Sequence, residues 1–360
     1  MEGALERATL GLVGIPLPSV DELIERSTVV SIPLVRPFRG LTHREVMVFL
    51  GTQGPGEWAA FTEYDDSVAT AWLRSALEQA FDPDIPQAPA DIDVIRVNAT
   101  FPALSPADVP GWWERFPGVA SAKVKVGEPG EALADDIVRV KAIRDTAGPE
   151  VSLRLDANAR WSLEQARDAL MSLAPFDIDY VEQPVATIDE MVALTRLLKD
   201  SGIRLAADEL IRQHHSLDEV IASQAADIAV VKVSPLGGIN RALEVARQAH
   251  AGGLEVVVSS ALETSVGLSW GVRAAAILAS EFGGLPDSGL GTGAFLQSDV
   301  VASPLSVSGG AVEVCSPELD PLKVETAQAN QERTKWWHER LRRCQPKTVI
   351  NPSRELADDC

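Results

Sequence analysis

Cysteine and basic residues are scarce in this sequence, and both shortages narrow the classes of protein to which it can belong. Its 360 residues include three cysteines, Cys315, Cys344 and Cys360, with neither the spacing of a metal site nor a disulfide framework. This usage fits a reducing, cytoplasmic setting. The chain has 32 lysines and arginines against 52 aspartates and glutamates, so its formal net charge is −20. We therefore expect no nucleic-acid partner and no membrane partner, and an anionic substrate would need local positive charge.

Long apolar runs and several well-known catalytic motifs are also missing. No run approaches the roughly 20 apolar residues of a membrane span, and the first residues lack the basic-then-apolar pattern of a signal peptide. The five histidines match no metal motif, and no Ser/His/Asp signature or phosphate-binding glycine loop occurs. The residues that are present are 46 % hydrophobic, which is enough to bury a sizeable core.

From residue 92 onward, apolar segments of strand length alternate with helical segments. About eight such units favour parallel βαβ connections that close into a barrel. We predict an α/β fold, a (β/α)7β TIM-like barrel with an α+β capping domain; a doubly wound sheet is the alternative, but its phosphate fingerprint is absent. The expected strands are 92–100, 120–127, 151–158, 178–184, 204–209, 228–234, 255–260 and 288–293. The expected helices include 133–147, 163–174, 188–199, 217–224 and 241–251.

The pattern before and after these units predicts the domain organisation. Two strands at 28–34 and 45–50 precede a helix at 66–81, which is typical of a small α+β module. A strand at 311–315 and a helix at 325–344 follow the barrel. The expected parts are an N-terminal segment (1–26, with a helix at 21–26), a capping domain (27–91), the barrel with the active site (92–293), a C-terminal segment packing back on both (294–345) and a flexible tail (346–360).

Two lysines alternate with valines at residues 123–126. Successive side chains of a strand point to opposite faces, so Lys123 and Lys125 share one face while the valines pack under a helix. If the lysines point inward, their ammonium groups are costly to bury without anionic partners. A solvated edge strand is the alternative, and the acidic residues downstream argue against it.

Three acidic residues end consecutive expected strands at a constant interval. Asp156, Glu182 and Asp208 are each 26 residues apart, which is one βα unit. Because the carboxyl ends of barrel strands meet at the functional face, we expect these carboxylates side by side around the barrel mouth. Such anions repel one another unless a cation lies between them, and all-oxygen ligation favours Mg²⁺ or Mn²⁺ over zinc. Arg154 and Asn158 have the same strand parity as Asp156 and are expected to point inward with it.

Two lysines flank the three carboxylates. Lys125 lies one strand before Asp156, and Lys232 follows Asp208 by 24 residues. A free lysine has a pKa of about 10.4, and neighbouring positive charge with partial burial lowers it toward the range of a useful base. A lysine beside a metal-held carboxylate can remove a proton α to that carboxylate.

The order of these motifs resembles the enolase superfamily, in its muconate-lactonising-enzyme-like branch, which uses Lys or His bases with Mg²⁺. The motifs are Lys-x-Lys at 123–125, Asp-x-Asn at 156–158, Glu-Gln-Pro at 182–184, Asp-Glu at 208–209 and the final Lys232. The resemblance covers nearly the whole chain. It implies a capping α+β domain on a (β/α)7β barrel.

Further segments are similar to one family of that branch, whose members dehydrate 2-succinyl-6-hydroxy-2,4-cyclohexadiene-1-carboxylate to an aromatic product in menaquinone synthesis. The resemblance implies a hydro-lyase with Mg²⁺, or alternatively Mn²⁺, and a small anionic substrate. The segments are residues 32–34, 37–40, 44–46, 56–64, 97–100, 122–126, 225–230 and 258–263.

The resemblance also implies a role for each site residue. Lys125 would be the base, and Lys232 would stabilise the dienolate from the opposite side of the ring. The metal ligands would be Asp156, Glu182 and Asp208. Substrate contacts would come from Lys123, Ser259, Ser260 and Arg39, and supporting contacts around the site from Arg154, Asn158 and Glu209.

Other functions remain open from the sequence. An N-acylamino-acid racemase or a dipeptide epimerase would use the same site, because lysines on both sides also suit two-base racemisation. A muconate-type cycloisomerase is a further alternative. A barrel that only binds a partner is a hypothesis of a different class, and the complete set of lysines and carboxylates argues against it.

Overall fold

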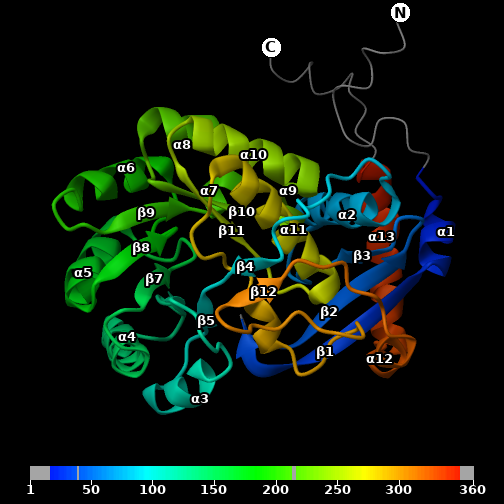
Figure 1. Ribbon diagram of the computed structural model, residues 1–360, viewed down its shortest axis with the longest axis horizontal. Coiled ribbons are helices and arrows are strands. Elements are labelled where there is room, and N and C mark those ends of the chain that lie inside the picture. The colour runs from blue at the N-terminus through cyan, green and yellow to red at the C-terminus, as the bar shows by residue number, and fades with distance from the viewer. Residues whose placement is uncertain (1–16, 39, 213–215, 349–360) are drawn as a thin grey trace, which may run out of the picture.

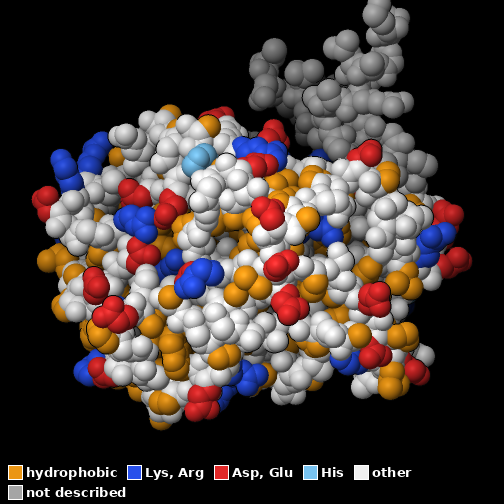
Figure 2. All heavy atoms as spheres, viewed as in Figure 1, with side chains coloured by type: hydrophobic (Ala, Val, Ile, Leu, Met, Phe, Trp, Pro, Cys, Tyr) orange, Lys and Arg blue, Asp and Glu red, His pale blue; other side chains and the backbone are white. Residues whose placement is uncertain are grey.

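A curled parallel sheet and a smaller antiparallel sheet lie beside each other in the molecule (Figure 1). The structure is a computed structural model and describes residues 17–38, 40–212 and 216–348. None of the helices formed by these residues has the length and apolar character to cross a membrane. Acidic and basic side chains are interspersed over the face seen in Figure 2.

The parallel sheet is the barrel, with seven strands in the sequential order β5 to β11. Two bridges join its edges, because Ser288 pairs with Val97 and Gly289 pairs with Ser259. The predicted fold class is confirmed, although the expected last strand at 288–293 is reduced to these two bridging residues. The strands are β5 (Ala99–Phe101), β6 (Ser121–Lys125), β7 (Ser152–Asp156), β8 (Ile178–Glu182), β9 (Arg204–Ala207), β10 (Ile228–Lys232) and β11 (Glu255–Ser259).

Helices between consecutive strands surround the barrel (Figure 1). Their starts follow from local sequence: Ser162 and Gln165 form a capping box at the first turn of α5, and Thr187 and Glu190 form one at α6. The helices are α3 (Val109–Trp113), α4 (Leu133–Ala147), α5 (Leu163–Leu173), α6 (Ile188–Leu197), α7 (Glu209–Arg212), α8 (Leu217–Ser223), α9 (Val233–Leu236), α10 (Ile239–Ala251) and α11 (Ser265–Phe282).

The antiparallel sheet belongs to the cap, which covers one end of the barrel (Figure 1, right). Its order is β1-β2-β3, and α2 packs on it. The C-terminal helix α13 packs against α2. Trp337 of α13 also makes an edge-to-face contact with Trp58 at the end of β3, with 5.1 Å between the ring centroids. The elements are α1 (Val20–Glu25), β1 (Ser27–Phe38), β2 (Leu41–Leu50), β3 (Pro55–Trp58), α2 (Asp66–Phe81), α12 (Pro321–Thr326) and α13 (Gln331–Thr348).

Several expected elements differ from the observed ones. The expected strand at 92–100 is divided into β4 (Val94–Arg96) and β5, and β4 pairs with β12 (Ala311–Glu313) outside the barrel sheet. The expected helix at 325–344 is also divided, because the Asn330 side chain accepts a hydrogen bond from Arg333 N and starts α13 afresh. The helix then continues to Thr348, into the segment expected to be a flexible tail.

The helix α11 was not among the expected helices, and its burial explains why. Most of its residues are buried, from Ser265 through Leu278. A helix that is apolar on all sides has no amphipathic stripe, which is the signal that predicts helices from sequence. Its N-terminus lies between the barrel and the cap, next to the site described below.

Candidate active site

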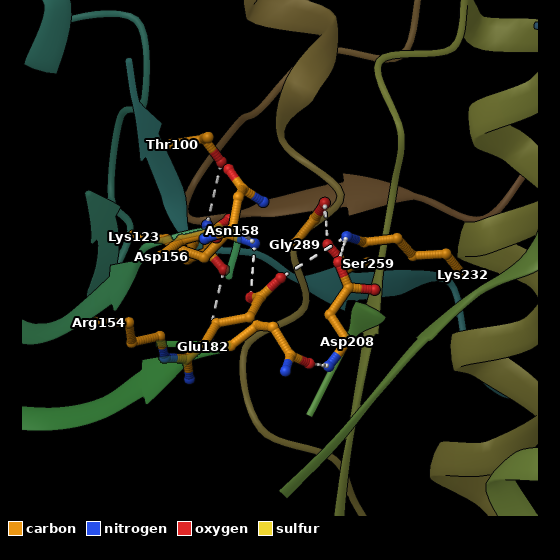
Figure 3. Close-up of polar contacts among 12 residues, drawn as sticks. Thr100, Lys123, Arg154, Asp156, Asn158, Glu182, Asp208, Lys232, Ser259 and Gly289 are labelled. Atoms are coloured by element: carbon orange, nitrogen blue, oxygen red, sulfur yellow. Dashed lines mark hydrogen bonds and ion pairs between the residues drawn. The ribbon is translucent and has the colours of Figure 1, made fainter. Parts of the chain in front are cut away.

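The register of the barrel strands brings charged side chains together at the carboxyl end of the sheet (Figure 3). Lys125 at the end of β6 lies opposite Asp156 on β7, and Asp156 lies opposite Glu182 on β8. Asp208 directly follows β9, and Lys232 is the last residue of β10. The one-unit spacing seen in the sequence therefore corresponds to one cluster in space.

Each lysine of the cluster contacts a carboxylate, and all six side chains are buried. The contacts are Lys125 Nζ to Asp156 Oδ2 at 2.6 Å, Lys123 Nζ to Glu182 Oε2 at 2.8 Å and to Asp156 Oδ2 at 3.5 Å, and Lys232 Nζ to Asp208 Oδ2 at 2.6 Å and to Glu182 Oε1 at 3.6 Å. Glu182 thus lies between Lys123 and Lys232.

The mutual contacts keep Asp156, Asp208 and Lys123 charged despite their burial. Burial alone would raise the pKa of Asp156, but Lys125 and Lys123 hold that pKa well below its ordinary value. Arg212 and Lys232 do the same for the pKa of Asp208. Burial would lower the pKa of Lys123, and the neighbouring Glu182 and Asp156 carboxylates raise it instead.

The carboxylates fit a hard divalent cation by their chemistry. Among the residues with described positions, no three His, Cys, Asp or Glu side chains converge as a ready metal-binding group, because the lysine ammonium groups lie between the carboxylates. Glu182 Oε1 is nevertheless buried and accepts no hydrogen bond from the part of the chain that the structure describes, so a cation would satisfy it. The donor set contains only oxygen, which suits Mg²⁺ or Mn²⁺.

Asn158 and Glu209 connect the lysine and carboxylate groups at the rim of the cluster. The Asn158 side-chain oxygen accepts a hydrogen bond from Lys125, and its Nδ2 donates to Glu209 Oε1 at 3.3 Å. Asn158 has a positive φ of 47°, which lets its backbone N–H reach back to Asp156 Oδ1 at 3.2 Å. Burial and the adjacent Asp208 raise the pKa of Glu209.

Arg154 points inward as expected, but its contacts are made away from the carboxylates. Its Nη1 donates to the Asp287 carbonyl at 2.6 Å, and its guanidinium lies over the Tyr180 ring at 5.1 Å. Two residues along a strand span about 6.6 Å, so Arg154 lies nearer the opposite end of the barrel than Asp156. Arg154 therefore helps form the floor beneath the site.

Ser259 and Ser260 line the same cavity as the lysines. Ser259 ends β11 opposite Lys232. The Ser260 hydroxyl donates to the Gly289 carbonyl at 2.6 Å and lies 2.8 Å from Thr292 Oγ1. These contacts fix the pair at the junction that closes the barrel.

The cap supplies an aromatic wall to this cavity, which the sequence did not predict. Phe38 at the end of β1 lies 5.8 Å from Lys125 Nζ, measured to the ring centroid. Arg39, the expected substrate contact next to it, lies outside the described residues. No periodicity connects these cap positions with the barrel strands. The other aromatic lining residues are Phe61, Tyr64 and Trp72.

Arg212 is a cation of the cavity wall that the sequence prediction missed. Its Nε contacts Asp208 Oδ1 at 2.9 Å, and its Nη2 contacts Glu209 Oε1 at 2.9 Å. The available signal was its spacing of four residues from Asp208 at the start of a helix, which places both on one face.

Comparison with known proteins agrees with this architecture. The model described as "Enolase C-terminal domain-like" matches residues 114–318, and the "Enolase N-terminal domain-like" model matches residues 29–80. Muconate lactonizing enzyme from Pseudomonas fluorescens, complexed with muconolactone, has a similar fold, with a TM-score of 0.69 at 20 % identity over 84 % of this chain and 98 % of that one. The fold and site define an enzyme of the enolase superfamily.

A closer relative identifies the family. The o-succinylbenzoate synthase of Mycolicibacterium smegmatis is 43 % identical over 335 residues, covering 91 % of this chain and 98 % of the relative. The chain belongs to the o-succinylbenzoate synthase family and is a lyase. Dipeptide epimerase from Cytophaga hutchinsonii, complexed with Mg and the dipeptide D-Ala-L-Val, shares the fold with a TM-score of 0.68 at 21 % identity over 84 % of this chain and 97 % of that one.

Proposed function

We propose that the protein dehydrates 2-succinyl-6-hydroxy-2,4-cyclohexadiene-1-carboxylate to 2-succinylbenzoate, as a step of menaquinone biosynthesis. The observation that carries this proposal is the position of Lys125 and Lys232 on β6 and β10, with the three carboxylate-bearing strands between them. A planar ring bound over the carboxylates would have one lysine at each side.

Lys125 acts as the base in this proposal. Its amine takes the proton from the ring carbon that bears the carboxylate, and the electron pair of that C–H bond is delocalised onto the carboxylate as a dienolate. The electron pair then forms the new ring double bond as the C–O bond breaks. The Lys125 ammonium returns the proton to the departing hydroxide, which leaves as water. Asn158 and Asp156, both in contact with Lys125 Nζ, hold the amine in position.

The other site residues stabilise charge and orient the substrate. The Lys232 ammonium faces the ring from the opposite side and stabilises the dienolate. Lys123 holds the ring carboxylate and adds positive charge beside Lys125. Ser259 and Ser260 contact the succinyl chain, with Arg39 as a further substrate contact, while Asn158, Glu209 and Arg154 support these groups from behind.

Asp156, Glu182 and Asp208 are the proposed ligands of Mg²⁺, with Mn²⁺ as the alternative. Enzymes of this superfamily typically use a divalent metal ion. The carboxylate set supports one here, as does Glu182 Oε1, which accepts no hydrogen bond from the described residues. The bound cation would supply positive charge to the substrate carboxylate as negative charge develops on it.

The assignments outside the site are also proposals. We propose a cytoplasmic enzyme, on the basis of its few cysteines, that acts on a small anionic molecule. Its net charge of −20 disfavours nucleic-acid and membrane partners. We propose a division into residues 1–26, the cap (27–91), the barrel (92–293), the returning segment (294–345) and the tail (346–360).

Racemisation of N-acylamino acids or epimerisation of dipeptides is a second candidate activity, because lysines on both sides of one carbon could exchange its proton. Incubation of N-succinylamino acids in D₂O separates the two functions. Deuterium incorporation without dehydratase activity would favour the racemase.

Loss of ultraviolet absorbance of the cyclohexadiene, followed with Mg²⁺ or with EDTA, tests the proposed dehydration. We expect rapid turnover by the wild type with Mg²⁺ and none with EDTA. Lys125→Ala should lose about 10²–10⁴-fold, because this is the typical contribution of general base catalysis. If the wild type leaves the diene unchanged, the proposal fails.

A further inference from the structure

We propose that Arg212 binds the second carboxylate of the substrate, at the end of the succinyl chain, and so makes the site selective for dianions. This inference rests on the proposed function. The substrate carries one carboxylate on the ring and one on the chain. A chain with a net charge of −20 repels such a dianion, so the cavity must supply a cation for each carboxylate.

The cations of the described cavity wall leave Arg212 available for this role. The four that line it are Lys123, Lys125, Lys232 and Arg212. Lys125 and Lys232 flank the ring, and Lys123 serves the ring carboxylate. Arg212 is the remaining cation, and a planar guanidinium is the side chain best matched to a carboxylate.

The hydrogen bonds of Arg212 leave part of its guanidinium unused. Nε and Nη2 contact Asp208 and Glu209, at the side of the carboxylate cluster. Nη1 makes no hydrogen bond within the described part of the chain. The Arg212 side chain lines the cavity and is only 12 % exposed, so a ligand carboxylate that accepts from Nη1 would be largely shielded from water.

The protonation of Arg212 gives a further argument. Lys125 is a neutral amine before it takes the substrate proton, so it cannot also neutralise a second carboxylate at that stage. The Arg212 guanidinium stays protonated, and the neighbouring Asp208 and Glu209 raise its pKa further. Its positive charge therefore remains available to a substrate carboxylate throughout the reaction.

Two ligands that differ in one carboxylate test this inference on the Mg²⁺-loaded full chain. One is the product, 2-succinylbenzoate, and the other is 2-butanoylbenzoate, in which a methyl group replaces the terminal carboxylate. Isothermal titration gives the Kd of each for wild type, Arg212→Met, Arg212→Lys, Arg39→Met and the control Arg241→Met, whose arginine pairs with Glu244 at the surface.

We expect Arg212→Met to weaken 2-succinylbenzoate binding by about 30-fold, a typical loss for a charge-assisted hydrogen bond, and to change 2-butanoylbenzoate binding less than about twofold. The Kd of 2-succinylbenzoate for Arg212→Lys should lie between those of the wild type and Arg212→Met, because lysine keeps the positive charge and lacks the planar guanidinium. The control should match wild type with both ligands.

Three other results would overturn the inference. An equal loss of affinity for both ligands would mean that Arg212 acts only through Asp208 and the metal. In that case a Mn²⁺ titration followed by electron paramagnetic resonance would show weaker metal binding by the variant. No loss for either would assign the chain carboxylate elsewhere, and a loss confined to Arg39→Met would assign it to Arg39. If the wild type turns over the diene in any of these cases, the proposed function stands and only the role of Arg212 fails.

Discussion

Lys123 illustrates how single residues of the site depend on one another. It contacts Glu182 and Asp156 together, and all three side chains are less than one-tenth exposed. Removing one partner of a buried ion pair leaves the other uncompensated, which costs about 3–5 kcal/mol. A bound divalent cation would replace the missing positive charge, so the cost should depend on metal.

We therefore expect Lys123→Met to lower the Tm markedly in EDTA and to recover much of the loss in Mg²⁺. Thermal unfolding with and without Mg²⁺ measures this, and Lys141→Met is a matched control, because its exposed pair with Asp145 is worth at most about 1 kcal/mol. A shift with Mg²⁺ no larger in the Lys123 variant than in wild type would contradict charge replacement, and with it the carboxylate metal site.

At the scale of elements, the sequence predicts those whose pattern is local. The helices at 66–81 and 133–147 have the predicted bounds, because an apolar stripe of helical period is complete within each segment. The division of the strand at 92–100 could not be predicted in this way. It depends on pairing with β12, more than 200 residues later, and on Val97 bridging to Ser288.

The site shows the same division between regular and irregular positions. The lysines and carboxylates recur once per βα unit, so their assembly follows from sequence spacing. Phe38 lines the cavity from a cap strand, and Arg212 lines it from a four-residue helix. Neither position belongs to the βα repeat, so the spacing in the sequence does not predict it. Predictions from spacing are therefore strongest for the barrel strands and weakest for the residues that surround the substrate.

The helix α10 provides a test at this scale, because its N-terminus depends on another element. Glu78 on α2 accepts hydrogen bonds from Ile239 N at 2.6 Å and Asn240 Nδ2 at 2.8 Å. Gly238 precedes the helix with a φ of 129°, and a Cβ there would lie 1.9 Å from Glu78 Oε2. The glycine thus permits the cap carboxylate to approach the barrel helix.

Gly238→Ala should lower the free energy of unfolding by about 3–5 kcal/mol, through backbone strain and displacement of Glu78. Gly130→Ala, with positive φ and open space around it, should show only strain, about 1–3 kcal/mol. Urea unfolding measures both. In a Glu78→Ala background, Gly238→Ala should lower the free energy of unfolding by less. If the two substitutions have strictly additive effects, position 238 and the Glu78 carboxylate do not interact.

At the scale of the whole molecule, two cap carboxylates hold the cap against the barrel. Glu78 contacts the start of α10, and Glu57 on β3 accepts from Thr264 N at 3.0 Å and Gly267 N at 3.1 Å at the start of α11. Neither forms an ion pair with a residue that the structure describes, and burial raises the pKa of each to about 7. Charging them therefore opposes the docking of the two domains.

The sign of the resulting pH dependence follows from these pKa values. A carboxyl with a folded-state pKa near 7 and an ordinary value of 4.5 binds protons more tightly when folded, so its stabilisation is complete below about pH 4.5 and is lost as the pH rises to about 7. Each group contributes up to about 3 kcal/mol over this range. The lowered pKa values of Asp156 and Asp208 make the free energy of unfolding increase with pH instead, but only at more acidic pH.

We expect the free energy of unfolding in EDTA to decrease between about pH 5 and pH 8. Glu78→Gln should flatten this decrease by up to about half, because it removes one of the two interface carboxyls whose pKa is near 7. Urea unfolding at half-unit steps of pH measures the slope. Glu244→Gln is the control, because Glu244 is 64 % exposed and should leave the slope unchanged. If the unfolding free energy of the wild type increases across this range, the two carboxylates do not control the docking of the cap. If Glu78→Gln leaves the decrease unchanged, the pH dependence of the unfolding free energy comes from Glu57 or from groups outside the interface.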